Sequence, residues 1–185
     1  AFLDASTRPD FLGALDEPAR SRWVDAVLAA IRGRDHRLED LLRWRAVEGL
    51  GQVARATAEV DVEAARDLVR RQLWSMNDES GGIAWHAPEA VGEVLHQVPA
   101  LQPDFVSVLA HHADTYPFGP GVAWAMARLA QGAAAPLVAE QTDVLLPALG
   151  REEPAVRGLA AAALGRAGVQ EAADTLRHLL GDPAP

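Results

Sequence analysis

Amphipathic helical segments, separated by prolines and glycines, recur along the chain, and this pattern constrains the fold more than any other feature. Apolar residues return every three or four positions, which is the period of a helix with one buried face. Prolines stand where first helical turns are expected, and glycines follow expected helix ends. Helices are predicted over residues 22–33, 38–55, 61–76, 87–98, 103–114, 120–132, 141–150, 154–168 and 170–181.

The composition agrees with an all-α protein and removes several kinds of chemistry. Alanine and leucine dominate, and hydrophobic residues make up 49% of 185 residues, which suits one domain with a sizeable core. The absence of cysteine excludes disulfides, thiolate metal sites and cysteine nucleophiles. All 17 basic residues are arginine, so a lysine Schiff base cannot form within this sequence.

The charge and hydropathy patterns bear on partners and location. The net charge is -9 and no basic stripe is visible, so we expect no nucleic-acid partner. No apolar run approaches the roughly 20 residues of a membrane span, and no signal-peptide pattern stands at the start. We therefore expect a cytoplasmic protein without a membrane partner.

An internal repeat runs through these helices. Similar small-residue positions occur at Gly51, Gly92, Ala127 and Gly165, at intervals of roughly 40 residues. A helix pair of this length cannot bury its apolar face alone, so successive pairs stack into a curved α-solenoid. Small residues in the final copy, "GLAAAALG", would let neighbouring helices approach closely.

The final copy, "EEPAVRGLAAAALGRAG", resembles the second helix of a HEAT-type repeat, as found in the phycocyanobilin-lyase-like HEAT group. The matching residues are Pro154, Val156, Arg157, Ala160, Ala161, Ala163, Leu164, Gly165 and Gly168. More degenerate copies lie at 41–51, 83–92 and 122–127, so the resemblance covers most of the chain from Arg22 onward. It implies an all-α, right-handed α-solenoid of about four HEAT-like helix pairs plus a terminal helix. The expected organisation is an N-terminal cap over 1–20, a single solenoid domain over 21–181 and a flexible tail over 182–185.

The second helix of each pair lines the concave surface in proteins of this kind, and polar and aromatic residues repeat there at helical spacing. One stripe is Trp44, Glu48, Gln52 and Arg55; the next is Trp85, Glu89, Glu93 and His96; the third is Trp124, Arg128 and Gln131. Tryptophan beside carboxylates is unlike an apolar core stripe and indicates a face open to water or a ligand. The alternative is an ordinary solvated face whose tryptophans shield apolar neighbours.

Two irregular connections precede the second and third of these helices. The first, over 77–86, holds Asp78 and Glu79, and it is long for a helix–helix turn if Pro88 stands in a first helical turn. A helix that starts near Ser80 and kinks at Pro88 is the alternative. The connection "TYPFGPG" over 115–121 holds Tyr116 and occupies the same place in the next repeat.

In a stacked solenoid these two turns are neighbours that would frame Trp85 and Trp124, whereas Trp74 is expected in the core. The alternative interpretation is that both are glycine-rich turns with N-capping polar residues.

Specific chemistries find little support in the spacing of the polar residues. Glu93 and His96 have the Glu-x-x-His spacing of di-iron carboxylate proteins, but no second copy exists. His111 and His112 are adjacent and diverge on a helix, and "NDES" lacks the spacing of a calcium loop. We therefore expect no metal and no cofactor.

Acid–base work by a carboxylate stays possible. Glu89 and Glu93 lie one turn apart and would repel each other, and tryptophans could desolvate Glu48, Glu89 or Glu93. No Ser-His-Asp arrangement or phosphate-binding loop is visible.

These observations favour a non-enzymatic scaffold that holds a protein or peptide partner, preferably a basic one, in a concave groove of tryptophan and glutamate. An enzyme or chromophore-lyase-like protein with a pocket around Trp85 and Glu89 is the alternative, and it rests on repeat resemblance. No catalytic residue is assigned. The candidate binding residues are Trp44, Glu48, Asp78, Glu79, Trp85, Glu89, Glu93, Tyr116, Trp124 and Arg128.

Overall fold

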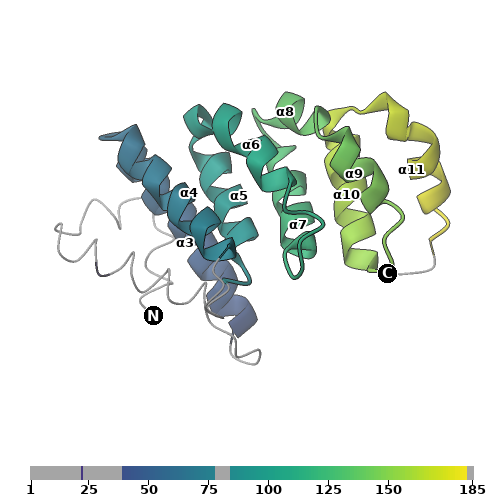
Figure 1. Ribbon diagram of the computed structural model, residues 1–185. Coiled ribbons are helices and arrows are strands. Elements are labelled where there is room, and N and C mark those ends of the chain that lie inside the picture. The colour runs from purple at the N-terminus through teal and green to yellow at the C-terminus, as the bar shows by residue number, and fades with distance from the viewer. Residues whose placement is uncertain (1–21, 23–38, 78–83, 183–185) are drawn as a thin grey trace. The chain divides into compact units, whose positions relative to one another are not determined.

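A computed structural model describes residues 22, 39–77 and 84–182 of the chain (Figure 1). The chain divides into two compact units, Ala1–Val98 and Pro99–Pro185, where the sequence indicated one continuous repeat domain. The predicted cap over 1–20, and all of the predicted first helix except Arg22, lie outside the described residues.

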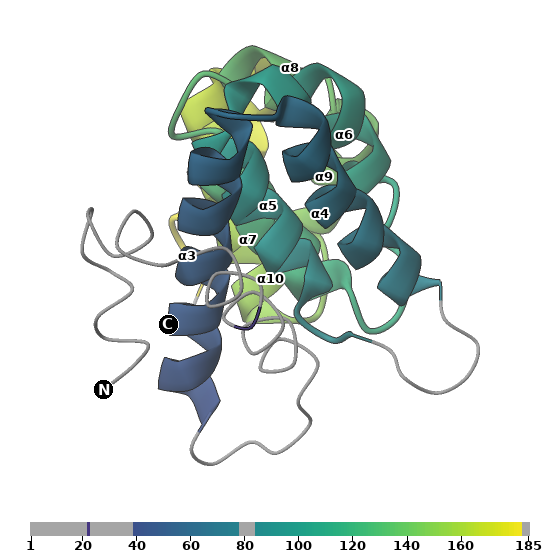
Figure 2. The ribbon, with the colours of Figure 1, turned by 90° about the vertical axis from the view of Figure 1, so that its left-hand side faces the viewer.

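The described part of unit 1 holds three long helices, and the last of them packs on the other two (Figure 2). The helices are α3 (Glu39–Ala58), α4 (Val62–Met76) and α5 (Ala87–Gln97). Most positions of α5 are buried, whereas α4 buries one stripe that includes Leu68 and Val69. The core of this unit therefore lies between α5 and the inner faces of α3 and α4.

Helices α3 and α5 lie parallel, about one repeat apart in the sequence. Arg43 contacts His86 near their starts, and Gly51 lies against Glu93 about two turns further along. Both contacts join residues with nearly the same offset, which matches the roughly 40-residue period seen in the sequence.

Unit 2 begins with a 3₁₀ turn and repeats this arrangement with α7 and α10 as its most closely packed pair. Its elements are η1 (Pro99–Leu101), α6 (Gln102–Ala110), α7 (Gly119–Leu129), α8 (Ala135–Ala139), α9 (Thr142–Ala148), α10 (Pro154–Ala167), η2 (Gln170–Ala172) and α11 (Ala173–Leu179). The side chain of Arg166 on α10 donates a hydrogen bond to the carbonyl oxygen of Ala127 on α7, at 2.9 Å. The offset is again close to one repeat.

The prediction of an all-α chain is confirmed over the described ranges, which hold helices and turns and no strand. Local signals place the helix ends. Asp61 caps α4 through its carboxylate, which accepts hydrogen bonds from two backbone N–H groups. Gly168 ends α10 with a φ of 73°, a left-handed conformation that favours glycine. Helix α5 starts at Ala87 with Pro88 in its first turn, so the kinked alternative is wrong.

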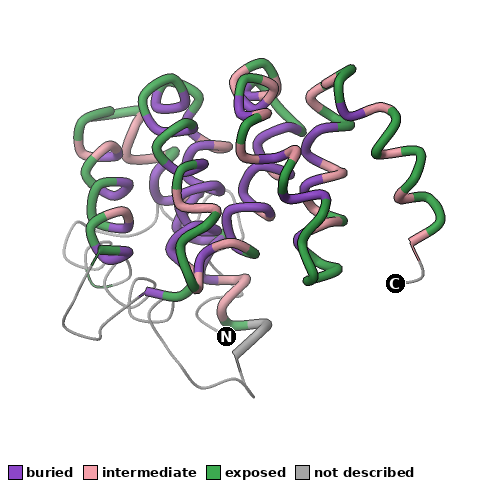
Figure 3. Tube along the Cα trace, turned by 45° about the vertical axis from the view of Figure 1, so that its right-hand side comes forward, coloured by how far each residue is buried: buried purple, intermediate pink, exposed green. Residues whose placement is uncertain are grey.

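Buried residues gather on the faces that the helices within each unit turn toward one another (Figure 3). Trp74 is an exception to prediction: it is 79% exposed on α4, so its expected place in the core is wrong. The buried stripe of α4 runs through Leu68, Gln72 and Met76, and Trp74 points away from it. The large apolar side chain of Trp74 was therefore not sufficient to place it on the buried face of α4.

The predicted flexible tail begins at Asp182, but this residue is held in unit 2. Its carboxylate pairs with the guanidinium of Arg157 at 2.7 Å, and its side chain is 21% exposed. Residues 183–185 lie outside the described part.

Candidate functional site

The predicted stripe residues of unit 1 lie on α3 and α5, except Trp85, which stands in the turn two residues before α5. Trp44 is half-buried with the guanidinium of Arg43 over its ring, 5.4 Å from the centroid. Glu48 is exposed and Trp85 is 37% exposed. Asp78 and Glu79 lie outside the described residues.

The predicted solvent exposure of Glu89 and Glu93 is wrong, because they are only 9% and 3% exposed. For Glu93 the cause is the close approach of α3 at Gly51. A Cβ atom at Gly51 would stand 2.7 Å from Cγ of Glu93, so the glutamate stem fills the space that a side chain there would need. The carboxylate of Glu93 accepts a hydrogen bond from Nε2 of Gln97 at 2.9 Å, which offsets part of its desolvation.

A hydrogen-bonded chain of three polar side chains lies near Trp85, and the sequence did not single out two of its members. Arg43 Nη1 donates to His86 Nε2 at 3.4 Å, and His86 Nδ1 lies 3.2 Å from Glu89 Oε1. Since guanidinium can only donate, Nε2 accepts and Nδ1 carries the proton toward Glu89. The other oxygen, Oε2, is buried without a hydrogen-bond partner in the described structure.

In unit 2 the predicted residues separate into two places. Trp124 and Arg128 are half-buried on α7, and Arg128 Nη1 donates to Gln131 Oε1 at 3.1 Å. Tyr116 lies in the connection before α7, is 85% exposed and lines a pocket. Of the predicted residues in this unit, Tyr116 lines this pocket, whereas Trp124 and Arg128 do not.

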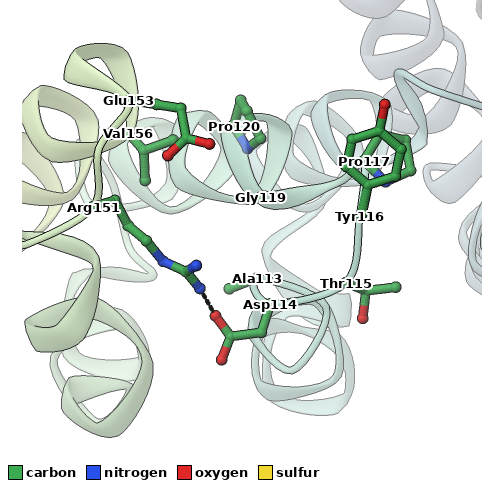
Figure 4. Close-up of a pocket in the computed structure, with 10 residues that line it drawn as sticks. All are labelled: Ala113, Asp114, Thr115, Tyr116, Pro117, Gly119, Pro120, Arg151, Glu153 and Val156. Atoms are coloured by element: carbon green, nitrogen blue, oxygen red, sulfur yellow. Dashed lines mark hydrogen bonds and ion pairs between the residues drawn. The ribbon is translucent and has the colours of Figure 1, made fainter.

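That pocket lies between the α6–α7 connection and the turn before α10 (Figure 4). Its volume is about 190 Å³. The lining residues are Ala113, Asp114, Thr115, Tyr116, Pro117, Gly119, Pro120, Arg151, Glu153 and Val156. Both walls belong to unit 2, and they come from the connections that precede the two closely packed helices α7 and α10.

Three charged groups line the pocket and leave it with one net negative charge. Arg151 reaches from the turn before α10 and forms an ion pair with Asp114 on the opposite wall (Figure 4). Glu153 contributes the second carboxylate. The side chains of Arg151 and Asp114 are 46% and 85% exposed, so we expect their pairing to contribute only about 0–1 kcal/mol.

Arg157, in the first turn of α10, fixes the backbone of the wall that carries Arg151. Its Nη1 donates to the carbonyl oxygens of Arg151 and Glu152 at 2.9 and 2.8 Å. Its Nε and Nη2 donate to both carboxylate oxygens of Asp182. The hydrogen bond to Asp182 raises the pKa of the Arg157 guanidinium, so this anchor stays charged.

The opposite wall begins beside a partly buried histidine. His112 packs edge-on against the ring of Phe118, with centroids 6.3 Å apart. Burial, and to a lesser degree the nearby charge of His111, lowers the pKa of His112 below its ordinary value of 6.5. The neutral imidazole is therefore the form that this packing favours.

The pocket residues missed by the sequence interpretation are Asp114, Arg151 and Glu153. The signal that could have found them is the equivalence of connections between repeats. The connection over 115–121 corresponds to the one over 77–86 in the preceding repeat. In the following repeat, the corresponding connection is "GREEP" over 150–154. The predicted helix begins after this charge run, at Pro154, and the sequence interpretation gives Arg151 no role.

No protein-family model matches this sequence, and no curated protein matches it. Within the described ranges, no group of three or more histidine, aspartate or glutamate side chains is placed to hold a metal ion. Among the helices of those ranges, none has the length and apolar character needed to cross a membrane. The function is therefore inferred from the geometry of the sites.

Proposed function

We propose that this protein is a peptide-binding scaffold and that the pocket between Tyr116 and Arg151 receives a side chain of a basic partner. The observation that carries this proposal is a concave site that joins an exposed aromatic ring to two carboxylates. Tyrosine at an exposed position is a frequent contact residue in interfaces, since it offers a large face and a polar tip.

The size of the pocket supports a side chain over a cofactor. Pockets for drug-sized ligands span roughly 300–1,000 Å³. A volume of about 190 Å³ is below that range and suits one side chain presented by a peptide. An extended tetrapyrrole would need a larger site.

The charges support a basic partner. Asp114 and Glu153 outnumber Arg151 in the pocket, and the whole chain carries a net charge of -9. A positive segment would be attracted over a distance and then meet accessible carboxylates. Glu89 and Glu93 are buried and do not enter this proposal.

The single tyrosine of the chain gives a direct test. Protein labelled with 3-fluorotyrosine has one ¹⁹F resonance, at Tyr116 in the pocket wall. Titration with blocked peptides that carry one arginine, one lysine or one glutamate in a Gly/Ser background should shift this resonance only for the basic peptides. A resonance that stays unmoved by every basic peptide would reject the proposal.

A matched pair of variants separates the pocket from general charge. Glu153→Gln removes a carboxylate that lines the pocket, whereas Glu152→Gln removes its exposed neighbour, which does not. We expect Glu153→Gln to weaken binding of the arginine peptide about two- to fivefold, the equivalent of a partly exposed ion pair. Equal effects of the two substitutions would show that only net charge matters.

We further propose that the helix pairs form a right-handed HEAT-like α-solenoid. This proposal is supported by a feature that occurs in both units. In each unit, two parallel helices that are about one repeat apart in the sequence pack together: α3 with α5, and α7 with α10. Small-angle scattering on the whole chain tests the arrangement, since a solenoid requires a rigid, curved particle. A distance distribution with two independently moving bodies would contradict it.

A second candidate is an enzyme or chromophore-lyase-like protein that uses Trp85 and Glu89. The observation that favours it is the His86–Glu89 pair, held by Arg43 and placed beside a partly exposed tryptophan. Such a pair could hold and transfer a proton. Titration with a bilin tetrapyrrole, read by tryptophan quenching in the wild type and in Glu89→Gln, tests it. Absence of quenching by the tetrapyrrole in the wild type would remove this candidate.

A further inference from the structure

The pocket of the proposed function already holds a guanidinium group, and that group belongs to the protein itself. Arg151 extends across the opening and its Nη2 pairs with Oδ1 of Asp114 (Figure 4). The acceptor for a basic partner is therefore occupied when no partner is present.

The side chain of Arg151 can leave this position without a change in the fold of the wall. Its backbone carbonyl is fixed by Arg157 at 2.9 Å. Its side chain is 46% exposed, and the carboxylate that it contacts is 85% exposed. Rotation about side-chain bonds is therefore enough to uncover Asp114, and the exposed ion pair resists this only weakly.

We propose that Arg151 is an internal competitor that occupies the acceptor position of the pocket, and that an arginine side chain of the partner displaces it. This inference rests on the proposed function, because it names the ligand group and the regulation of the same pocket. The incoming guanidinium takes over the carboxylate of Asp114. Glu153 remains as a second acceptor for either guanidinium.

The same geometry selects arginine over lysine. A guanidinium is planar and can donate two parallel hydrogen bonds to a carboxylate such as that of Asp114. The ammonium of lysine is a compact point charge and cannot form this two-pronged contact. The ligand group could belong to a peptide or to free arginine, so the two sources need separate titrations.

The test compares Arg151→Gln with wild type, using the ¹⁹F resonance of Tyr116 and two probes. One probe is a blocked Gly/Ser peptide with a single arginine, and the other is N-acetyl-arginine amide. Removal of the competitor should tighten binding of the peptide about two- to fivefold, since an exposed ion pair no longer has to be broken. A comparable increase in affinity for both probes would show that the pocket recognises the guanidinium alone. An increase for the peptide alone would show that it recognises a peptide segment.

Arg177→Gln is the matched control. Arg177 lies on α11 of the same unit and forms an exposed ion pair with Asp174, and neither residue lines the pocket. Its substitution changes the net charge by the same amount. Tightening by Arg151→Gln beyond that of Arg177→Gln supports the competitor, and equal changes overturn it.

A double-mutant cycle with Asp114→Asn locates the effect. If Arg151 competes for Asp114, then Arg151→Gln should have no effect on affinity once Asp114 is replaced. If the wild type binds the peptide and Arg151→Gln leaves the affinity unchanged or lowers it, the proposal that Arg151 competes is wrong. The proposed peptide-binding function would still stand. Absence of binding by wild type and by Arg151→Gln would overturn both.

Discussion

The close approach of α3 and α5 at Gly51 leads to a prediction with an internal reference. Gly51 and Gly165 occupy the same position in two copies of the repeat, and both lie inside helices. A Cβ atom at Gly51 would lie 2.7 Å from Cγ of Glu93 and 3.0 Å from Cγ of Gln97. A Cβ atom at Gly165 would meet no atom within 4 Å.

The expected magnitudes follow from two opposing terms. Replacing a helical glycine by alanine stabilises the helix by about 1 kcal/mol at either position. Overpacking at Gly51 costs about 1–3 kcal/mol, because the third nearest atom is the backbone oxygen of Glu93 at 3.3 Å and cannot move alone. We therefore expect Gly165→Ala to stabilise unit 2 by about 1 kcal/mol, and Gly51→Ala to destabilise unit 1 by up to about 2 kcal/mol.

The two methionines of the chain allow each unit to be followed separately. Met76 is buried in unit 1 and Met126 in unit 2, so ¹³C-methyl methionine signals report the two units during a urea titration. The midpoint at Met76 should fall in Gly51→Ala, and the midpoint at Met126 should rise in Gly165→Ala. A Gly51→Ala variant that gains as much stability as Gly165→Ala would refute the close approach and, with it, the explanation for the burial of Glu93.

Three further predictions concern individual side chains. Gln72 is 1% exposed, and neither of its amide atoms has a hydrogen-bond partner in the described structure. Gln72→Leu should therefore raise the free energy of unfolding of unit 1 by about 1–3 kcal/mol, measured by urea unfolding. A loss of stability would show that the amide does have hydrogen-bond partners. The pKa of His112 is lowered, so the unfolded chain binds more protons and stability should fall as the pH drops below about 6.5. His112→Asn should flatten that part of the pH profile of unfolding, and an unchanged slope would contradict this assignment. Asp61→Ala removes two capping hydrogen bonds and should cost about 1 kcal/mol, which a thermal melt of the variant measures.

The positions of the helices could be predicted because their signals are local. Asp61, Pro88 and Gly168 act on the backbone next to them, and each stands where the sequence places it. Helix α8 was missed because "APLVA" is too short to show a period.

The surroundings of the side chains could be predicted only in part, because they depend on which helices meet. From the sequence, the carboxylates of Glu89 and Glu93 indicate an open face, but the bare backbone at Gly51 lets α3 approach and cover the stem of Glu93. Asp114 and Arg151 are far apart in the sequence and meet only because α7 packs on α10. No local pattern contains that contact.

The pairing of Arg151 with Asp114 has a consequence for the strength of any ligand that competes for the same carboxylate. A group tethered by its own side chain acts at an effective concentration on the order of millimolar or more. A free guanidinium at micromolar concentration would therefore be outnumbered at Asp114 by the arginine that the chain supplies. Because the exposed pair itself contributes only about 0–1 kcal/mol, this competition would weaken every ligand of Asp114, isolated or multivalent, by about the same two- to fivefold factor.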